Sequence, residues 1–221
     1  MIITGKGPLL IKFQSREIIE SLQSGLVYMN GLGVFINMEE QEEDDEVGDR
    51  MEEQIYSTAY VLPSGSACGL RLKVDDGTDN YVFCLFYVSE NQESFRFNDM
   101  QKKKILKFGD TALVIKDFGE FIHRTVNAAK DKGYEMHHRE VSYYDENDEM
   151  NMEVTDCLTR GLCNMAFFKR ERYQHQQEYR LAVNKERTGE DHVELDIGDI
   201  SDISVKVSTE QILDEGIDII N

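Results

Sequence analysis

The sequence predicts one α+β domain, residues 1–221, in which a mixed or antiparallel sheet carries three to four helices. Many short apolar segments of strand length are separated by turn residues, and the helical segments do not alternate with them regularly. Regular alternation would instead predict a doubly wound parallel sheet. Only two prolines, Pro8 and Pro63, occur in 221 residues, so no proline-rich linker divides the chain. These observations favour a single core.

The first part of the chain predicts a strand, a helix and then several short strands. Leu9–Phe13 is an apolar run of strand length. Ser15 is placed to cap a helix whose apolar residues recur at helical spacing, and Gly25 is placed to end it. Further strands are expected at residues 26–29, 34–36, 54–62, 69–74 and 81–88. Asp76 and Gly77 predict the turn between the last two.

The second part predicts one well-marked helix among further strands. Asp117 and Glu120 have the spacing of a capping box, and Gly133 ends the apolar stripe that follows them. A helix is also expected near the lysines of residues 89–108, which are otherwise polar and ambiguous. The remaining expectations are helices at residues 157–168 and 209–213 and strands at residues 111–115, 140–144, 179–183, 193–197 and 203–207.

The formal net charge of −19 bears on the partners of this chain. Such a surface repels phosphate backbones and anionic lipid, so neither nucleic acid nor membrane is expected as its main docking surface. Ten acids and one base lie in residues 39–53. This segment is expected to be either a solvated, mobile loop or a docking face for a basic protein partner. The N-terminus lacks an export signal, which favours a soluble, cytoplasmic protein.

Common cofactor and metal motifs are missing from the sequence. It contains no glycine-rich dinucleotide or phosphate loop and no nucleophile elbow. The cysteines form no C-x-x-C pair, and His137 and His138 are adjacent on an expected strand, so they would point to opposite faces. No metal site is therefore expected.

Two segments carry residues that suit chemistry. Leu10–Ser15 leads into a helix that closes on Gly25-Leu26. Tyr173–Arg180 has the sequence Y-Q-H-Q-Q-E-Y-R, which crowds glutamines and a glutamate at the start of an apolar strand. A carboxylate in such a place has specific work, because burying it without compensation is costly.

These segments resemble motifs of the ADP-ribosyltransferase fold, which has a split sheet. The first resembles its opening strand and helix, with Lys12 where transferases place His or Arg. Gln176-x-Glu178 resembles its closing Gln/Glu-x-Glu motif, and Phe167-Phe168 lies where its target-recognition turn falls. Tyr87, after the strand 82–86, is the nearest match to the middle motif, although no S-T-S triplet follows that strand.

The chain as a whole also resembles a broad family of bacterial and phage proteins whose motifs are not tied to one activity. The matching segments include Gly48–Glu52, Val82–Leu85, Phe108–Asp110 and a late F-x-K…Y-x-x-Q-x-E-Y-R-L pattern. This likeness spans most of the chain. It implies a role in conflict between phages and bacteria, as a toxin or a defence effector.

The resemblance implies an enzyme that cleaves NAD and transfers ADP-ribose to a macromolecule, whether protein or nucleic acid, or to water. Glu178 would stabilise the transition state, with Gln176 as its partner carboxamide, and Lys12, Ser15 and Tyr87 would contact NAD. For Glu178 the alternative is an ion pair with Arg180 or with the basic cluster 169–172. The alternative for the whole chain is a non-enzymatic, acidic interaction protein on the same scaffold, such as a phage inhibitor or a defence sensor.

Overall fold

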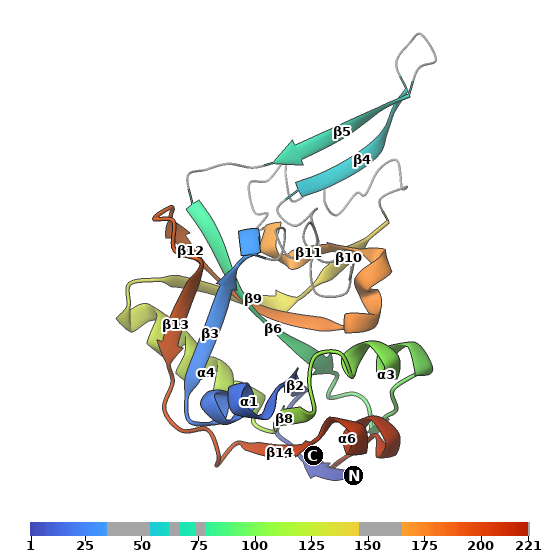
Figure 1. Ribbon diagram of the computed structural model, residues 1–221, viewed down its shortest axis with the longest axis vertical. Coiled ribbons are helices and arrows are strands. Elements are labelled where there is room, and N and C mark those ends of the chain that lie inside the picture. The colour runs from blue at the N-terminus through green and yellow to red at the C-terminus, as the bar shows by residue number, and fades with distance from the viewer. Residues whose placement is uncertain (35–53, 62–66, 74–77, 146–164, 221) are drawn as a thin grey trace.

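The computed structural model describes residues 1–34, 54–61, 67–73, 78–145 and 165–220 (Figure 1). Its main sheet has eight strands, and every pairing between them is antiparallel. These strands are β2 (Leu9–Gln14), β3 (Leu26–Gly31), β6 (Thr78–Val88), β8 (Thr111–Ile115), β9 (Glu135–Glu140), β12 (Glu178–Glu186), β13 (His192–Asp196) and β14 (Ser204–Ser208). The α+β class and the antiparallel sheet are therefore confirmed.

The sheet divides along one edge of β6. On that edge β2 pairs with residues 86–88, and β3 pairs with residues 81 and 82. Residues 83–85 lie between the two ladders and, among the described strands, pair only with β12 on the other edge. The order β14-β8-β2 continues from one half of the split, and β3-β13 continues from the other. The strands predicted at 9–13 and 179–183 thus both pair with the strand predicted at 81–88.

Three small sheets accompany the main one. The first joins β1 (Ile2–Thr4) to β15 (Ile217–Ile220) in parallel and β15 to β7 (Ser94–Phe95) antiparallel, so the two termini lie side by side (Figure 1). The second pairs β10 (Ser142–Tyr144) with β11 (Phe168–Arg170) in parallel. The third is a hairpin of β4 (Gln54–Val61) and β5 (Ala67–Lys73).

The two faces of the main sheet carry different helices. On one face α1 (Arg16–Gln23) and α4 (Phe118–Asp131) bury apolar stripes against the strands. The other face is covered at one end by α3 (Asp99–Ile105) and α6 (Thr209–Glu215). Two 3₁₀ turns, η1 (Met165–Phe167) and η2 (Glu171–Gln176), lie next to β11 in the chain.

Alternation along the strands produces these faces, because successive side chains of a strand point in opposite directions. In β6 the odd residues Tyr81, Phe83 and Leu85 belong to the cluster under α1 and α4. The even residues belong to the other face, where Phe86 and Val88 join one apolar cluster and Val82 joins a second. The second face therefore has two separate apolar clusters with a space between them.

The helix boundaries follow local capping. Asn98 and the side chain of Gln101 form a reciprocal capping box at the start of α3. Asp117 accepts the Glu120 N–H at the start of α4, but the Glu120 carboxylate binds Arg124, so only half of the predicted capping box forms. Ser15 is the N-cap residue of α1 without a capping hydrogen bond from its side chain.

Two expectations in the second part of the chain are wrong in detail. The strand expected at 140–144 is two strands, β9 and β10, because β9 pairs along its full length with β12 in spite of its polar sequence. Residues 165–168, the end of the helix expected at 157–168, instead form η1 and the first residue of β11. Residues 35–53, 74–77 and 146–164 lie outside the described residues, so the expectations for the acidic loop, the Asp76-Gly77 turn and residues 157–164 do too.

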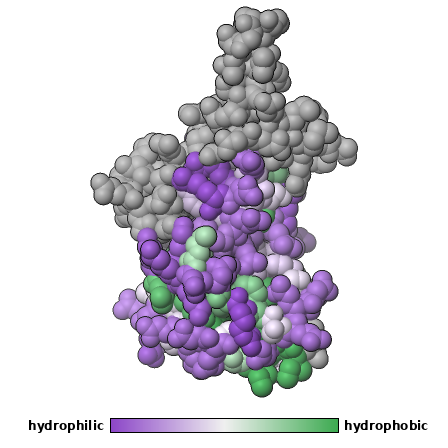
Figure 2. All heavy atoms as spheres, turned by 90° about the vertical axis from the view of Figure 1, so that its right-hand side faces the viewer, coloured by the Kyte–Doolittle hydropathy of each residue, from purple (hydrophilic) through white to green (hydrophobic). Residues whose placement is uncertain are grey.

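The surface view in Figure 2 shows a mostly hydrophilic face, with apolar residues gathered at the end that holds the termini. Ile2 and Ile220, on the small sheet formed by β1, β15 and β7, are among the exposed apolar side chains. None of the helices in the described part of the chain has the length and apolar character needed to cross a membrane.

Candidate functional site

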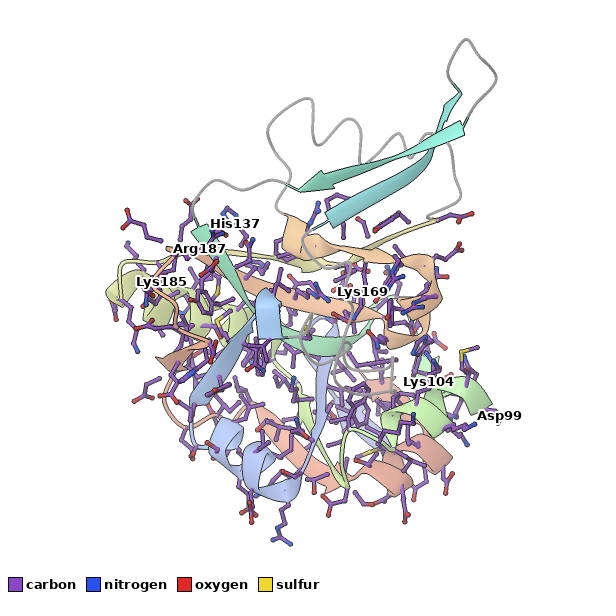
Figure 3. The ribbon with its side chains drawn as sticks, turned by 45° about the horizontal axis from the view of Figure 1, so that its top comes forward. Asp99, Lys104, His137, Lys169, Lys185 and Arg187 are labelled. Carbon is purple, nitrogen blue, oxygen red and sulfur yellow. The ribbon has the colours of Figure 1, made fainter. Side chains whose placement is uncertain are left out.

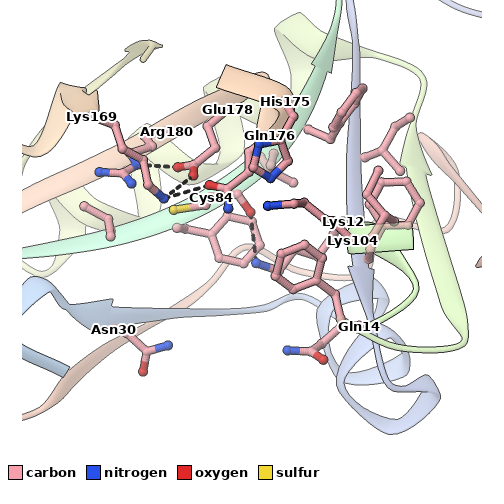
Figure 4. Close-up of a pocket in the computed structure, with 18 of the residues that line it drawn as sticks. Lys12, Gln14, Asn30, Cys84, Lys104, Lys169, His175, Gln176, Glu178 and Arg180 are labelled. Atoms are coloured by element: carbon pink, nitrogen blue, oxygen red, sulfur yellow. Dashed lines mark hydrogen bonds and ion pairs between the residues drawn. The ribbon is translucent and has the colours of Figure 1, made fainter. Parts of the chain in front are cut away.

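A cavity of about 240 Å³ lies at the split of the main sheet. It borders residues 83–85 of β6, which pair with no described strand on this edge, with β2 on one side and β3 on the other. The residues at the start of β12 close it (Figure 4). Its lining residues are Ile11, Lys12, Phe13, Gln14, Tyr28, Asn30, Val82, Phe83, Cys84, Leu85, Phe86, Lys104, Ile105, Phe108, Lys169, His175, Gln176, Glu178 and Arg180. The sheet is thus hollowed where it divides.

A buried ionic cluster forms one wall of this cavity. The Lys169 ammonium donates to Glu178 Oε1 at 2.7 Å, and Arg180 Nε donates to Glu178 Oε2 at 2.6 Å (Figure 4). Lys169 also donates to Gln176 Oε1 at 2.7 Å, and Arg180 Nη1 donates to the Ala166 carbonyl at 2.7 Å. The exposed fraction is 5% for Lys169, 8% for Glu178 and 1% for Arg180. Each charge in this ionic cluster is therefore compensated by neighbouring groups of the protein.

Strand alternation places the cluster on the second face of the sheet. Glu178 and Arg180 are two residues apart on β12, so they share a face, and they lie opposite Phe86 and Cys84 of β6. Ala182, the next residue on that face, already belongs to an apolar cluster. The charges thus occupy the space between the two apolar clusters. Such burial is tolerated because each charge has a partner.

Neighbouring elements fix Lys169 and Glu178 in position. Lys169 lies in β11, and its ammonium lies 4.7 Å from the centre of the Tyr173 ring, itself 2% exposed. Tyr143, in the paired strand β10, accepts the Glu178 N–H through its hydroxyl at 2.9 Å. The pairing of β10 with β11 therefore holds the ionic cluster from outside the main sheet.

The turn before β12 is strained at Gln177. This is the one residue other than glycine with a positive φ in the described part of the chain, at φ 40° and ψ 53°. Its backbone carbonyl accepts the Tyr87 N–H at 2.8 Å, and its side-chain oxygen accepts Gln101 Nε2 at 2.9 Å. Left-handed residues that carry a side chain cost roughly 1 kcal/mol or more and concentrate at functional sites. Here the turn brings Gln176 and Glu178 to one cavity.

Lys12 enters the cavity from β2. Its ammonium donates to the Cys84 carbonyl at 2.9 Å and lies 4.7 Å from the centre of the Phe83 ring. Cys84 lies in the segment of β6 that has no ladder partner on this edge among the described strands, so Lys12 takes the place of a strand partner. Gly109, with φ 151°, lets β8 begin close to the end of β2. A Cβ at this position would lie 2.2 Å from the Gln14 carbonyl carbon.

The burial and the charges shift the pKa values of these groups. Burial by itself disfavours the Glu178 carboxylate, but Arg180 and Lys169 outweigh it and hold the pKa of Glu178 well below its usual range. Burial lowers the pKa of Lys12. Burial raises the pKa of the Cys84 thiol to about 12, so the thiol is protonated and a poor nucleophile at neutral pH.

The cavity is cationic in a strongly acidic protein. Lys12, Lys104, Lys169 and Arg180 line it, and Glu178 supplies the single carboxylate among the described lining residues. Lys104, on α3, and Lys169 lie toward the same side of the molecule, and His137, Lys185 and Arg187 lie at another end (Figure 3). Aromatic rings supply much of the remaining wall: Phe13, Tyr28, Phe83, Phe86 and Phe108. Positive charge beside aromatic rings suits a ligand that is both anionic and planar.

The structure brings three of the five predicted site residues together. Lys12, Gln176 and Glu178 line the cavity. Tyr87 does not line it: its ring stacks on Tyr179 on the opposite face, with ring centres 5.7 Å apart and planes at 19°. Ser15 is exposed outside the cavity, and its N–H donates to Gln14 Oε1. Tyr87 follows Phe86, which does line the cavity. Because successive side chains of a strand point to opposite faces, the Tyr87 ring lies on the face away from the cavity.

Several lining residues were not predicted from the sequence. Lys169 and Arg180 were expected only as ion-pair alternatives for Glu178, and that ion pair is present. Tyr28 and Asn30 of β3 were not singled out at all. A signal existed for them, because they alternate with the fully buried Val27 and Met29 and so occupy the other face of the strand.

In the described residues no group of three or more histidine, cysteine or carboxylate side chains could hold a metal ion. No protein-family model, curated protein sequence or solved structure matches the chain.

Proposed function

We propose that this protein is ADP-ribosyltransferase-like and binds NAD in the cavity, where it cleaves the bond between nicotinamide and ribose. One observation carries the proposal: Lys12 from β2 and Gln176 and Glu178 from the start of β12 line a single cavity on either side of β6. These are the residues through which the sequence resembles the first and last motifs of that superfamily. Their convergence supports the resemblance more than either motif does alone.

The charges of the cavity suit the parts of NAD. Lys12 lies on the β2 side and is suited to contact the pyrophosphate, because its only polar partner among the described residues is a backbone carbonyl. An arriving phosphate would favour the charged form of this lysine, whose pKa burial lowers. Gln176 accepts a hydrogen bond from Lys169 beside Glu178, and its carboxamide is the proposed partner of that carboxylate at the ribose.

Glu178 is the residue proposed to act on the reacting carbon. A carboxylate has about four lone-pair positions, so the two cations bound to Glu178 leave positions for a ribose hydroxyl. When the glycosidic bond breaks, its electron pair goes to the nicotinamide nitrogen, and nicotinamide leaves as a neutral molecule. Glu178 would stabilise the positive charge that develops on the ribose. The acceptor oxygen then bonds to the ribose carbon and gives up its proton to the solvent.

A second candidate is a non-enzymatic binding protein with the same cavity. The observation that favours it is the pairing of Glu178 with both Lys169 and Arg180. Two cations beside one carboxylate leave less negative charge for a developing ribosyl cation. In this case the cavity would bind an anionic ligand, and the acidic surface would bind a basic protein.

Nicotinamide release from NAD, measured by chromatography, separates the two candidates. Wild-type protein should release nicotinamide, and Glu178→Gln should release it roughly 10²–10³ times more slowly. Glu171→Gln is the matched control, since Glu171 is exposed on η2 and does not line the cavity. No release by the wild type, with and without protein and nucleic-acid acceptors, would overturn the enzymatic proposal and favour the binding protein.

The Glu178→Gln protein needs its own stability measurement. Its carboxylate compensates two buried cations, so the substitution removes more than a reacting group. Rates should be compared at a temperature at which thermal unfolding curves show both proteins to be folded. Lost activity in a folded variant supports the proposal, and equal activity of the two proteins removes Glu178 from the mechanism.

A further inference from the structure

The β3 side of the cavity has features that the proposed chemistry does not use. Tyr28 lines the cavity and is 41% exposed, which makes it one of the few large apolar side chains on the described surface. Its hydroxyl has no hydrogen-bond partner among the described residues. A ring of this size at a cavity rim leaves apolar area in contact with water, and a ligand can remove that contact.

His192 fixes the orientation of the Tyr28 ring. The His192 ring, on the neighbouring strand β13, stacks on Tyr28 with centres 4.5 Å apart and planes at 14°. Such a stack restricts rotation of the tyrosine side chain. His192 thereby covers one face of the ring, and a second planar group would stack on the other face.

Asn30 provides a polar group next to this ring. It lies two residues beyond Tyr28 on β3, so both side chains are on the cavity face of the strand (Figure 4 labels Asn30). Its amide makes no hydrogen bond to any residue in the described ranges. An asparagine amide can donate to and accept from the edge of an adenine base at the same time.

We propose that Tyr28 and Asn30 form a subsite for the purine base of the ligand, with Tyr28 stacking on the base and Asn30 binding its edge. This inference rests on the proposed function for the direction of the ligand. If the nicotinamide ribose lies at Glu178, the other end of NAD, which is adenine, points away from the ionic cluster toward the rim. The rim of the cavity at Tyr28 is suited to a base, and the lysine and arginine side chains that line the cavity are suited to phosphates.

AMP and ribose 5-phosphate test the subsite, because they share the sugar and phosphate and differ by the base. Titration calorimetry should show that wild-type protein binds AMP more tightly than ribose 5-phosphate. Tyr28→Leu should weaken AMP binding roughly 5- to 150-fold and leave ribose 5-phosphate binding unchanged. Tyr28→Phe should retain AMP affinity, since it keeps the ring. Asn30→Leu, of similar shape, should also weaken AMP binding alone.

Ile18→Ala is the control variant, because Ile18 is also an exposed apolar residue (48%) and does not line the cavity.

A second readout uses the wild type only. In saturation-transfer NMR, the base protons of AMP should receive more magnetisation from the protein than the ribose protons. A protein that binds AMP no better than ribose 5-phosphate, or equal AMP affinity in the wild type and Tyr28→Leu, overturns the subsite.

The outcome for the subsite is separate from the outcome for the enzyme. If the wild type releases no nicotinamide but binds AMP through Tyr28, the subsite stands and the enzymatic proposal fails. If the wild type releases nicotinamide but Tyr28→Leu binds AMP normally, the enzymatic proposal stands and the subsite fails.

Discussion

Glu178 and Tyr179 are consecutive residues of β12, yet they belong to opposite faces of the sheet with different roles. Glu178 lies in the ionic cluster, where each of its oxygens binds a cation. Tyr179 stacks between Tyr87 and the edge of Phe118 in the apolar core under the helices. One strand therefore supplies the apolar core with its odd residues and a polar site with its even residues.

The cavity face should depend on complete charge pairing. Arg180→Met removes one cation and leaves the buried Glu178 carboxylate with less compensation, so we expect a loss of about 3–5 kcal/mol in the free energy of unfolding. Urea unfolding measures it. Arg187→Met is the control, because the ion pair of Arg187 with Asp79 is partly exposed, at 48% and 30%, and should be worth about 0–1 kcal/mol. Similar losses in both variants would contradict a special role for the ionic cluster.

The core face should affect stability without affecting the ligand. Leu181 follows Arg180 and is fully buried in the core under α1 and α4. Leu181→Ala should lower the free energy of unfolding by roughly 2–5 kcal/mol, because it leaves a cavity among packed side chains. NAD affinity at a temperature where the variant is folded should be unchanged. A large loss of affinity would show that the two faces are not independent.

Lowering the pH should reduce the stability of the folded protein, because Glu178 on the cavity face becomes protonated. The pKa of this residue is lowered in the folded protein, so its carboxylate contributes stability above the unfolded pKa of about 4.3 and loses it as pH falls toward the folded value. The wild type should therefore exceed Glu178→Gln in stability most at neutral pH, and the difference should narrow below about pH 4. Urea unfolding at several pH values tests this, and a constant difference would contradict it.

The smallest effect is expected at Tyr87. Its ring lies on the core face, and Tyr87→Phe keeps the stack on Tyr179. NAD affinity and nicotinamide release should therefore equal those of the wild type within error. A marked loss of NAD affinity would return Tyr87 to the binding site and break the assignment of faces.

The sequence predicted most strands of the main sheet, since apolar runs bounded by turn residues mark β2, β6, β8, β12, β13 and β14. It missed β1, β7 and β15, because segments of two to four residues carry too little pattern. It also misplaced β9, whose sequence Glu135–Glu140 has little apolar content and which is held by its ladder with β12.

The site was predictable only in part, because its residues come from strands whose register is set by tertiary pairing. Gln176 and Glu178 stood out by composition, and Lys12 stood out through the resemblance of its strand to the opening ADP-ribosyltransferase motif. No local sequence pattern could show that β2 and β3 pair with different segments of β6. The gap between those two segments creates the cavity. Tyr28 and Asn30 therefore became recognisable as lining residues only in the folded chain.

Calorimetric titration of NAD onto wild type, Lys12→Met and Lys103→Met tests the claim that the split of the sheet binds an anionic nucleotide. The two variants lose the same charge, but Lys12 lines the cavity and Lys103 is exposed on α3. Lys12→Met should bind NAD roughly 10- to 100-fold more weakly, as expected for a lost charge-assisted contact. Lys103→Met should match the wild type. Equal affinity in all three proteins, or no binding by the wild type, would contradict the claim.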